Sequence, residues 1–416
     1  MIEHDREPIP NKFWTPGVFI LLGIMGAGVL AGMYRILFGL QASTNLTDHF
    51  PWGIWIAYDV EARVALSAGG FTMAALTHIF NRHKYERIVR SALLTAMLGY
   101  SFAVVGLLMD LGRYYNAWHP AMPWMWQGNS VLFEVGMCVM AYLTVLYIEF
   151  SPMFFERFAG RVNLPGPFSR LNEPSNALLE LAGKVMPRVM SLFLILGVVL
   201  SCMHQSALGS LILVAPYKTS ALWFTPILPL LFLLSAIAAG FPMVTFEQLY
   251  AAWAFRRKPP MDLLSSLGKW AAALLGIYCL AKLSDFVIRG AYAHFFPLSL
   301  ASVMLVIEVV GGVFVPLGML ITERVRKSPA LIFTACCLIV FGIILNRLNV
   351  FLVAYRPPYM TNAYVPSVAE VLVSLGLTAG MIFAYRVAVT VFPVFTRAKS
   401  GRHVSSTAVL ETANAK

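Results

Sequence analysis

The chain has 416 residues, of which 59% are hydrophobic and only 12% are charged, and its net charge is +11. Soluble domains carry about 25% charged residues, so this composition excludes an ordinary soluble fold and predicts an all-α membrane protein. The basic residues lie in loops between apolar runs, so we interpret the positive charge as a topology signal and expect no nucleic-acid partner.

Ten runs are apolar and long enough to cross a bilayer, for which about 20 residues suffice. In chain order they occupy residues 16–38, 53–80, 88–109, 129–149, 189–213, 221–246, 266–288, 298–321, 330–353 and 368–391. We therefore expect about ten transmembrane helices, arranged as two four-helix bundles and a C-terminal helix pair. The expected units are an N-terminal bundle over 1–150, a cytoplasmic connection over 151–188, a second bundle over 189–321, the helix pair over 322–395 and a cytoplasmic tail over 396–416. Within the connection, Asn172 or Ser175 could cap a short amphipathic helix.

Lysine and arginine are distributed unequally between the two sides of the membrane. One side, which holds both termini, carries Arg82, Lys84, Arg87, Arg90, Arg157, Arg161, Arg170, Arg256, Arg257, Lys258, Arg324, Arg326 and Lys327; the loops of the other carry Arg113, Lys218, Arg289 and Arg356. By the positive-inside rule both termini are cytoplasmic, as expected for a multi-pass protein of a bacterial inner membrane. The basic side could also contact anionic membrane lipid.

The expected second span, Pro51 to Phe71, carries Asp59, Glu61 and Arg63. A charged side chain in hydrocarbon costs at least about 2.5 kcal/mol, so these residues should face a protein interior or a water-filled site. Asp59 and Arg63 are four residues apart and can form an ion pair on one helix face, whereas Glu61 points elsewhere.

Most other ionisable residues within the spans fall in their outer halves. They are Arg35, Glu134, His204, Asp285, Arg347 and Glu370, with Glu308 nearest the middle. Glu247 lies near an inner end and is expected to reach water. This one-sided distribution predicts a polar cavity near the outer surface. For any single residue, a structural ion pair is the alternative interpretation.

Haem and metal ligands are scarce in the sequence. Only His78 and His204 lie in expected spans, at opposite ends, so they cannot share one iron. The five cysteines all lie in spans without a cluster-binding spacing, and we interpret them as apolar filling. We therefore expect no haem, no iron–sulfur cluster and no metal site in this chain.

A quinone suits a cofactor-free polar site of this kind, because its reduction takes up protons that buried carboxyl and imidazole groups can supply. The candidate quinone-binding residues are Tyr34, Arg35, Asp59, Arg63, His119 and Glu134. The candidate proton-transfer residues are Asp59, Glu134, His204, Asp285, Glu308, Arg347 and Glu370. An ordinary interface aromatic is an equal interpretation for Tyr34. The aromatic outer loop at 110–130 suits the membrane interface or a docked partner.

Several long motifs resemble the NrfD/PsrC integral membrane subunits, in particular the HybB-like branch and related menaquinone-reducing complexes such as Qrc. They are PWGIWIAYDVEARVALSAGGF, DLGR with NAWHP, NSVLFEVGMCVMAYLTVLYIEFSP, MHQSALGSL and FTPILPLLFLLSAIAAGFPMVTFE. The resemblance implies a subunit without prosthetic groups that binds menaquinone or ubiquinone near the periplasmic face. It also implies two partners, a four-cluster ferredoxin-like iron–sulfur subunit and a periplasmic catalytic subunit of the hydrogenase, molybdopterin or multihaem cytochrome type. By the resemblance, Asp59, Glu134 and His204 match polar places in these motifs, whereas Glu61 and Arg63 are not placed on the family pattern.

The sequence therefore predicts the quinone-reactive membrane subunit of a periplasm-facing oxidoreductase complex, with proton uptake or translocation. A proton-coupled secondary transporter is the alternative, although neither inverted repeats nor broken helices are clear. A purely structural anchor would gain nothing from the buried charges.

Overall fold

The computed structural model describes residues 12–358, 360 and 363–395. In this part of the chain the regular structure is helical, apart from an isolated bridge between Thr219 and Tyr355. The tail expected over 396–416 lies outside the described residues.

Nine helices of the described chain are long and apolar enough to cross a membrane, which confirms the all-α membrane class. They are α1 (Pro16–Phe38), α5 (Glu86–Asp110), α6 (Val131–Phe158), α7 (Asn172–Ser210), α8 (Leu228–Ala254), α9 (Met261–Ile288), the run of α10 (Leu300–Val306), η11 (Ile307–Phe314) and α11 (Val315–Ile321), the run of α13 (Pro329–Leu348) and η12 (Asn349–Val353), and α14 (Val368–Val391). Short helices α2 (Leu40–Ser43) and α12 (Glu323–Lys327) lie between them.

The expected count of ten spans is not confirmed, because the segment expected at 53–80 is helical but discontinuous. It comprises the π-helix η1 (Trp55–Ala62), α3 (Arg63–Leu66), α4 (Gly69–Ala74) and a second π-helix, η2 (Ala75–Ile79). A turn at Ser67 and Ala68 separates α3 from α4. Most of this segment is buried by other helices, so it lies inside the protein rather than against lipid.

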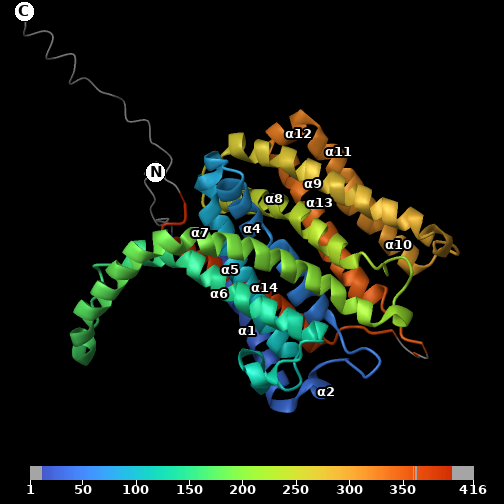
Figure 1. Ribbon diagram of the computed structural model, residues 1–416, viewed down its shortest axis with the longest axis horizontal. Coiled ribbons are helices and arrows are strands. Elements are labelled where there is room, and N and C mark those ends of the chain that lie inside the picture. Colours follow the sequence, from blue (N-terminus) through green and yellow to red (C-terminus); the bar gives the residue numbers. More distant parts are fainter. Residues whose placement is uncertain (1–11, 359, 361–362, 396–416) are drawn as a thin grey trace, which may run out of the picture.

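The connection before the fifth expected span differs from the prediction. Instead of a separate amphipathic helix, α7 begins at Asn172 and continues for 39 residues through Pro187 to Ser210. Its first half projects beyond the other helices in Figure 1, with Leu178 and Leu181 exposed. Asn172 and Asn176 fasten the preceding loop by bonding the backbone of Leu164 and Val162.

Helices that are distant in the sequence pack side by side. The first spanning helix, α1, lies along the last, α14, while α6 packs on α7, and α8 packs on α7, α9 and α13. In Figure 1, α9 to α13 occupy one side of the molecule and α1, α5, α6 and α14 the other. The discontinuous segment lies between these groups, because η1 contacts α5, α13 and α14.

Glycine pairs allow two of these contacts. Gly28 of α1 meets Gly376 of α14, and Gly312 of η11 meets Gly342 of α13. Membrane helices approach closely through small residues because packing, rather than hydrophobic transfer, drives their association.

We expect Gly28→Val to separate α1 from α14 and to lower the free energy of unfolding by about 1–3 kcal/mol, the usual cost of overpacking. A Cβ at Gly28 would lie 2.6 Å from the Gly376 Cα and 2.9 Å from the Leu372 carbonyl oxygen. Gly23→Val is the matched control, because nothing lies within 4 Å of a Cβ there. Thermal unfolding of both purified variants in detergent measures the difference, and equal stability would contradict the close contact.

Candidate functional site

The expected ion pair between Asp59 and Arg63 is present and buried, with exposed side-chain fractions of 0% and 6%. Asp59 also accepts a hydrogen bond from the Ser374 hydroxyl, and Arg63 donates to Thr378 Oγ1 at 3.3 Å. Ser374 and Thr378 belong to α14. Gly106 of α5 leaves room for the acid, since a Cβ there would lie 2.6 Å from the Asp59 Cβ. The pair is therefore enclosed by η1, α5 and α14.

The π-helical form of η1 determines how its charges are distributed. Well under 1% of residues in proteins are π-helical, and such segments occur often at functional sites because the extra residue per turn changes which side chains share a face. Asp59 is bonded by Ser374 of α14, whereas Glu61 makes no hydrogen bond and has the charge of Arg347 of α13 in its neighbourhood.

Glu61 is completely buried, and neither of its carboxyl oxygens has a hydrogen-bond partner. The charge that acts on it is that of Arg347. The terminal nitrogens of Arg347 donate to Asn346 Oδ1 at 2.6 Å and Ser235 Oγ at 2.9 Å, and the guanidinium lies 3.6 Å from the centre of the Phe232 ring. Arg347 is therefore held by its own neighbours and acts on Glu61 only as a nearby charge, without a hydrogen bond.

Glu308 of η11 is the centre of a second buried cluster. Its carboxylate pairs with Lys282 of α9 and accepts hydrogen bonds from Trp223 Nε1 at 2.9 Å, Asn346 Nδ2 at 2.8 Å and Asn349 Nδ2 at 2.7 Å. Asn346 bonds both Glu308 and Arg347, so it joins this cluster to the charge opposite Glu61.

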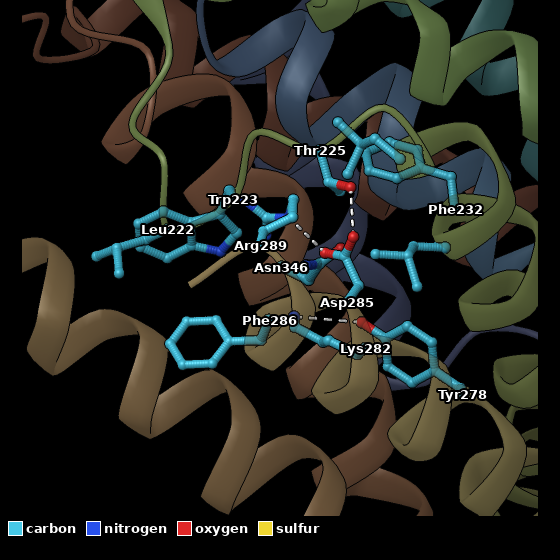
Figure 2. A pocket seen from close by; sticks show the side chains of 12 residues that line it. Leu222, Trp223, Thr225, Phe232, Tyr278, Lys282, Asp285, Phe286, Arg289 and Asn346 are labelled. Atoms are coloured by element: carbon cyan, nitrogen blue, oxygen red, sulfur yellow. Dashed lines mark hydrogen bonds and ion pairs between the residues drawn. The ribbon is translucent and has the colours of Figure 1, made fainter. Parts of the chain in front are cut away.

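A small cavity adjoins this cluster (Figure 2). Asp285 lines it, accepting from Thr225 Oγ1 at 2.6 Å and Arg289 Nε at 2.9 Å, and Lys282 and Tyr278 lie beside it. Its volume is about 20 Å³, enough for about one water molecule and far below the several hundred Å³ of a small-molecule pocket. The cavity suits water rather than an organic ligand.

Glu370 lies in the first turn of α14 and holds the loop that precedes this helix. Its carboxylate accepts hydrogen bonds from the backbone N–H of Ser367 at 2.8 Å and of Asn45 at 3.0 Å, and from the Tyr364 hydroxyl at 2.5 Å. Burial raises the pKa of Tyr364 most, and the hydrogen bond to Glu370 raises it further. The phenol of Tyr364 therefore stays protonated and remains a hydrogen-bond donor. These contacts explain the burial of Glu370 by a structural role at the start of α14.

Arg35 is also engaged with the backbone. It is only 2% exposed and donates to the carbonyl oxygens of Met109, at 2.7 Å, and Leu111, where α5 ends. Tyr34, its neighbour, is 43% exposed and packs on Phe38. Arg35 therefore satisfies the C-terminal end of α5, and Tyr34 lies on the surface.

Glu134 and His119 belong to other elements than the Asp59–Arg63 pair. Glu134 is exposed in the first turn of α6, and His119 is half-buried in the short helix η5 (His119–Ala121), its ring 4.4 Å from that of Trp118. Helices α6 and η5 contact each other. Among the described residues, no hydrogen bond or ion pair joins either side chain to Asp59.

His204 of α7 is fully buried between helices. Its Nδ1 lies 3.3 Å from the Tyr100 hydroxyl, whereas its Nε2 has no partner. Tyr100 in turn packs edge-on against Tyr142 at 4.6 Å. This group belongs to α5, α6 and α7, and among the described residues no hydrogen bond joins its side chains to the carboxylates of η1 or η11.

The candidate residues thus fall into separate groups rather than one outer cavity. Sequence reasoning missed Lys282 as the partner of Glu308, Ser374 and Thr378 beside the Asp59–Arg63 pair, and the position of Glu61 opposite Arg347. The expectation that Glu247 reaches water is wrong: it is 7% exposed and accepts a 2.6 Å hydrogen bond from Tyr385. Its partner lies 138 residues later, which no local pattern could indicate.

The fold and these buried charges define an all-helical membrane protein with ionisable groups at several depths. Residues 42–357 match the family described as polysulphide reductase, NrfD, and the chain belongs to this family. It is a multi-pass protein of the bacterial inner membrane.

Three relatives illustrate the range of the family. The probable Ni/Fe-hydrogenase 2 b-type cytochrome subunit of Escherichia coli is 33% identical, over 97% of this chain and 98% of that protein. The menaquinone reductase integral membrane subunit of Nitratidesulfovibrio vulgaris is 28% identical, over 92% of both. A selenate reductase subunit of Mesobacillus selenatarsenatis is 26% identical, over 91% of this chain and 94% of that protein.

The first relative is named as a b-type cytochrome subunit, but the two histidines expected within spans, His78 and His204, do not suit one shared haem. His78 interacts with Glu86 at the start of α5, whereas His204 meets Tyr100, 14 residues further along that helix. At 1.5 Å per residue the two positions are about 21 Å apart, too far to ligate one iron. Within the described residues, no group of three or more His, Cys, Asp or Glu could hold a metal ion.

Proposed function

We propose that this chain is the quinone-reactive membrane subunit of a periplasm-facing respiratory complex. It would exchange electrons between an iron–sulfur partner of the four-cluster ferredoxin type and menaquinone or ubiquinone, with a periplasmic hydrogenase, molybdopterin enzyme or multihaem cytochrome as the catalytic subunit. The observation that carries the proposal is the Asp59–Arg63 pair, a buried carboxylate and cation beside Gly106 of α5, four residues before that helix ends and the aromatic loop begins. The names of the relatives support the same complex class.

In the proposed reaction a quinone takes two electrons from the iron–sulfur partner and two protons, giving the quinol. Asp59, held by Arg63 and Ser374, would hold or pass a proton at its carboxylate, while the cation would bind a quinone carbonyl. Tyr34, Arg35 and His119 stay candidates for the quinone-binding surface, and Glu134 for proton entry. His204, Asp285, Glu308, Arg347 and Glu370 stay candidates for proton transfer. We propose that no haem takes part.

Glu134→Gln tests this function without disturbing the interior, because Glu134 is exposed. We expect quinone-linked turnover to fall by at least about 10²-fold, the lower range for loss of a proton-transferring group, with dye-linked activity of the complex unchanged. Glu323→Gln, an exposed acid at the other end of the molecule, should change neither activity. Purification of the chain without redox partners would instead favour a transporter.

A further inference from the structure

Glu61 is a buried carboxyl group that the proposed quinone chemistry does not use. It is 0% exposed, and both oxygens lack hydrogen-bond partners. A buried carboxyl group without partners is unfavourable as an anion unless water or a bound proton compensates it. Glu61 therefore requires either an internal water or a proton.

Three π-helical segments converge on the groups around Glu61. Four such segments occur in the described chain, and η1, η11 and η12 supply Glu61, Glu308 and Asn349 respectively. All three pack against α13, which contributes Asn346 and Arg347. This concentration of a rare helix type on one polar cluster is typical of a functional site.

Other buried atoms near this cluster also lack partners, namely Arg347 Nε, Asn349 Oδ1 and Gln205 Oε1. Gln205 lies beside the turn that follows Glu61, because its Nε2 donates to the Val64 carbonyl at 2.9 Å. Buried waters usually bridge such unsatisfied groups. Unsatisfied atoms of this kind are places where internal water would bind between Glu61 and the second cluster.

The charges facing Glu61 can be named element by element. On its own segment, Asp59 and Arg63 neutralise each other, and the α14 hydroxyls of Ser374 and Thr378 bind that pair. Helix α5 carries Tyr100, which meets His204, and η12 carries no titratable group. Arg347 of α13 is the remaining charge, and Asn346 connects it to the Glu308–Lys282 pair.

We infer that Glu61 is a proton-exchange site. Its carboxylate takes up one proton to become a neutral carboxylic acid, and this acid releases the proton through internal water towards the Glu308–Lys282 pair and its cavity. Only an O–H bond forms and breaks. With Glu61 ionised, the set Glu61, Arg347, Glu308 and Lys282 is neutral; with Glu61 protonated it carries one positive charge. Arg347 is a positioning residue: its positive charge favours the ionised form of Glu61 and therefore the release of the proton. This role adds a proton-exchange residue to the proposed function. Proton transfer by Glu61 during quinone turnover rests on that proposed function.

The test uses the complete purified complex and begins with infrared spectroscopy in H₂O and D₂O. We expect the wild type to show the C=O band of a buried protonated carboxyl group, which shifts in D₂O and is lost in Glu61→Gln. Asp262→Asn, which alters a carboxyl group in a surface pocket, should keep the band. Arg347→Gln should retain the band to higher pH, because removal of a nearby cation favours the neutral acid.

The second measurement is proton movement in proteoliposomes during quinone turnover. Glu61→Gln should retain electron transfer but lose proton movement beyond that of quinone chemistry itself. Absence of the band in the wild type, or its persistence in Glu61→Gln, overturns the inference. If the Glu61→Gln complex does not assemble, the Glu61→Asp variant is measured instead. A C=O band at the same position as in the wild type would then overturn the inference. A wild-type complex without quinone turnover would refute the proposed function, while the infrared band would still decide the role of Glu61.

Discussion

Replacing Asp59 with Asn is expected to reduce quinone-linked turnover of the complex by about 10²–10⁴-fold, the contribution of a positioned acid or base. Asn keeps the size of the side chain and can still bond Ser374, but it can neither carry a proton nor balance Arg63. Dye-linked activity of the partner subunits should remain, because it does not require the quinone. Steady-state assays with a soluble menaquinone analogue and with an artificial dye make the comparison.

The loss of charge balance in Asp59→Asn requires its own control. Removing one partner of a buried ion pair leaves the other charge uncompensated and costs about 3–5 kcal/mol, which could reduce assembly. The double variant D59N/R63Q removes both charges, so it should assemble better while quinone turnover stays low. Normal quinone turnover in both Asp59→Asn and Glu134→Gln would contradict the proposed site.

Lys282→Met is expected to lower the free energy of unfolding by about 3–5 kcal/mol, because it leaves the carboxylate of Glu308 buried without its cation. Glu308 is 1% exposed, and the three remaining donors, Trp223, Asn346 and Asn349, are neutral. They solvate the anion but do not balance its charge. Denaturation of the purified protein in detergent, followed by tryptophan fluorescence, measures the change.

The double variant K282M/E308Q should be less destabilised than Lys282→Met, because no unpaired charge remains. Lys327→Met is the matched control: its partner Glu323 lies at the surface, with 65% of its side chain exposed, and water screens the pair. We expect no measurable change in that control. If Lys282→Met is as stable as the wild type, the Glu308–Lys282 contact is not a balanced ion pair.

Local patterns predicted those features that depend on neighbouring residues. Apolar runs predicted the spanning helices, because consecutive side chains of a helix that crosses the bilayer are exposed to an apolar environment. The four-residue spacing predicted the Asp59–Arg63 pair, which the structure confirms. The family resemblance, carried by long motifs, is likewise confirmed.

Other features depended on contacts that no local pattern describes. Ser374 bonds Asp59 from a position 315 residues later, and Asn346 bonds Glu308 from 38 residues later. The helix is interrupted at Ser67 and Ala68, but in the sequence these two residues lie within a continuous apolar run, which did not predict the interruption. The π-helical turns of η1 are also not predicted by the 3.6-residue periodicity of an α-helix.

The sequence by itself determined that this protein is embedded in a membrane and that a few charged residues must be hidden there, since hydrocarbon tolerates neither polar backbone nor isolated charge. Only the tertiary structure decided how those charges are shared. It brought Ser374 and Thr378 of α14 to the Asp59–Arg63 pair and left Glu61 buried without a hydrogen bond, with Arg347 as the nearby charge. The physical reason is that burial and charge balance depend on which helices pack together, and packing joins residues that lie far apart along the chain.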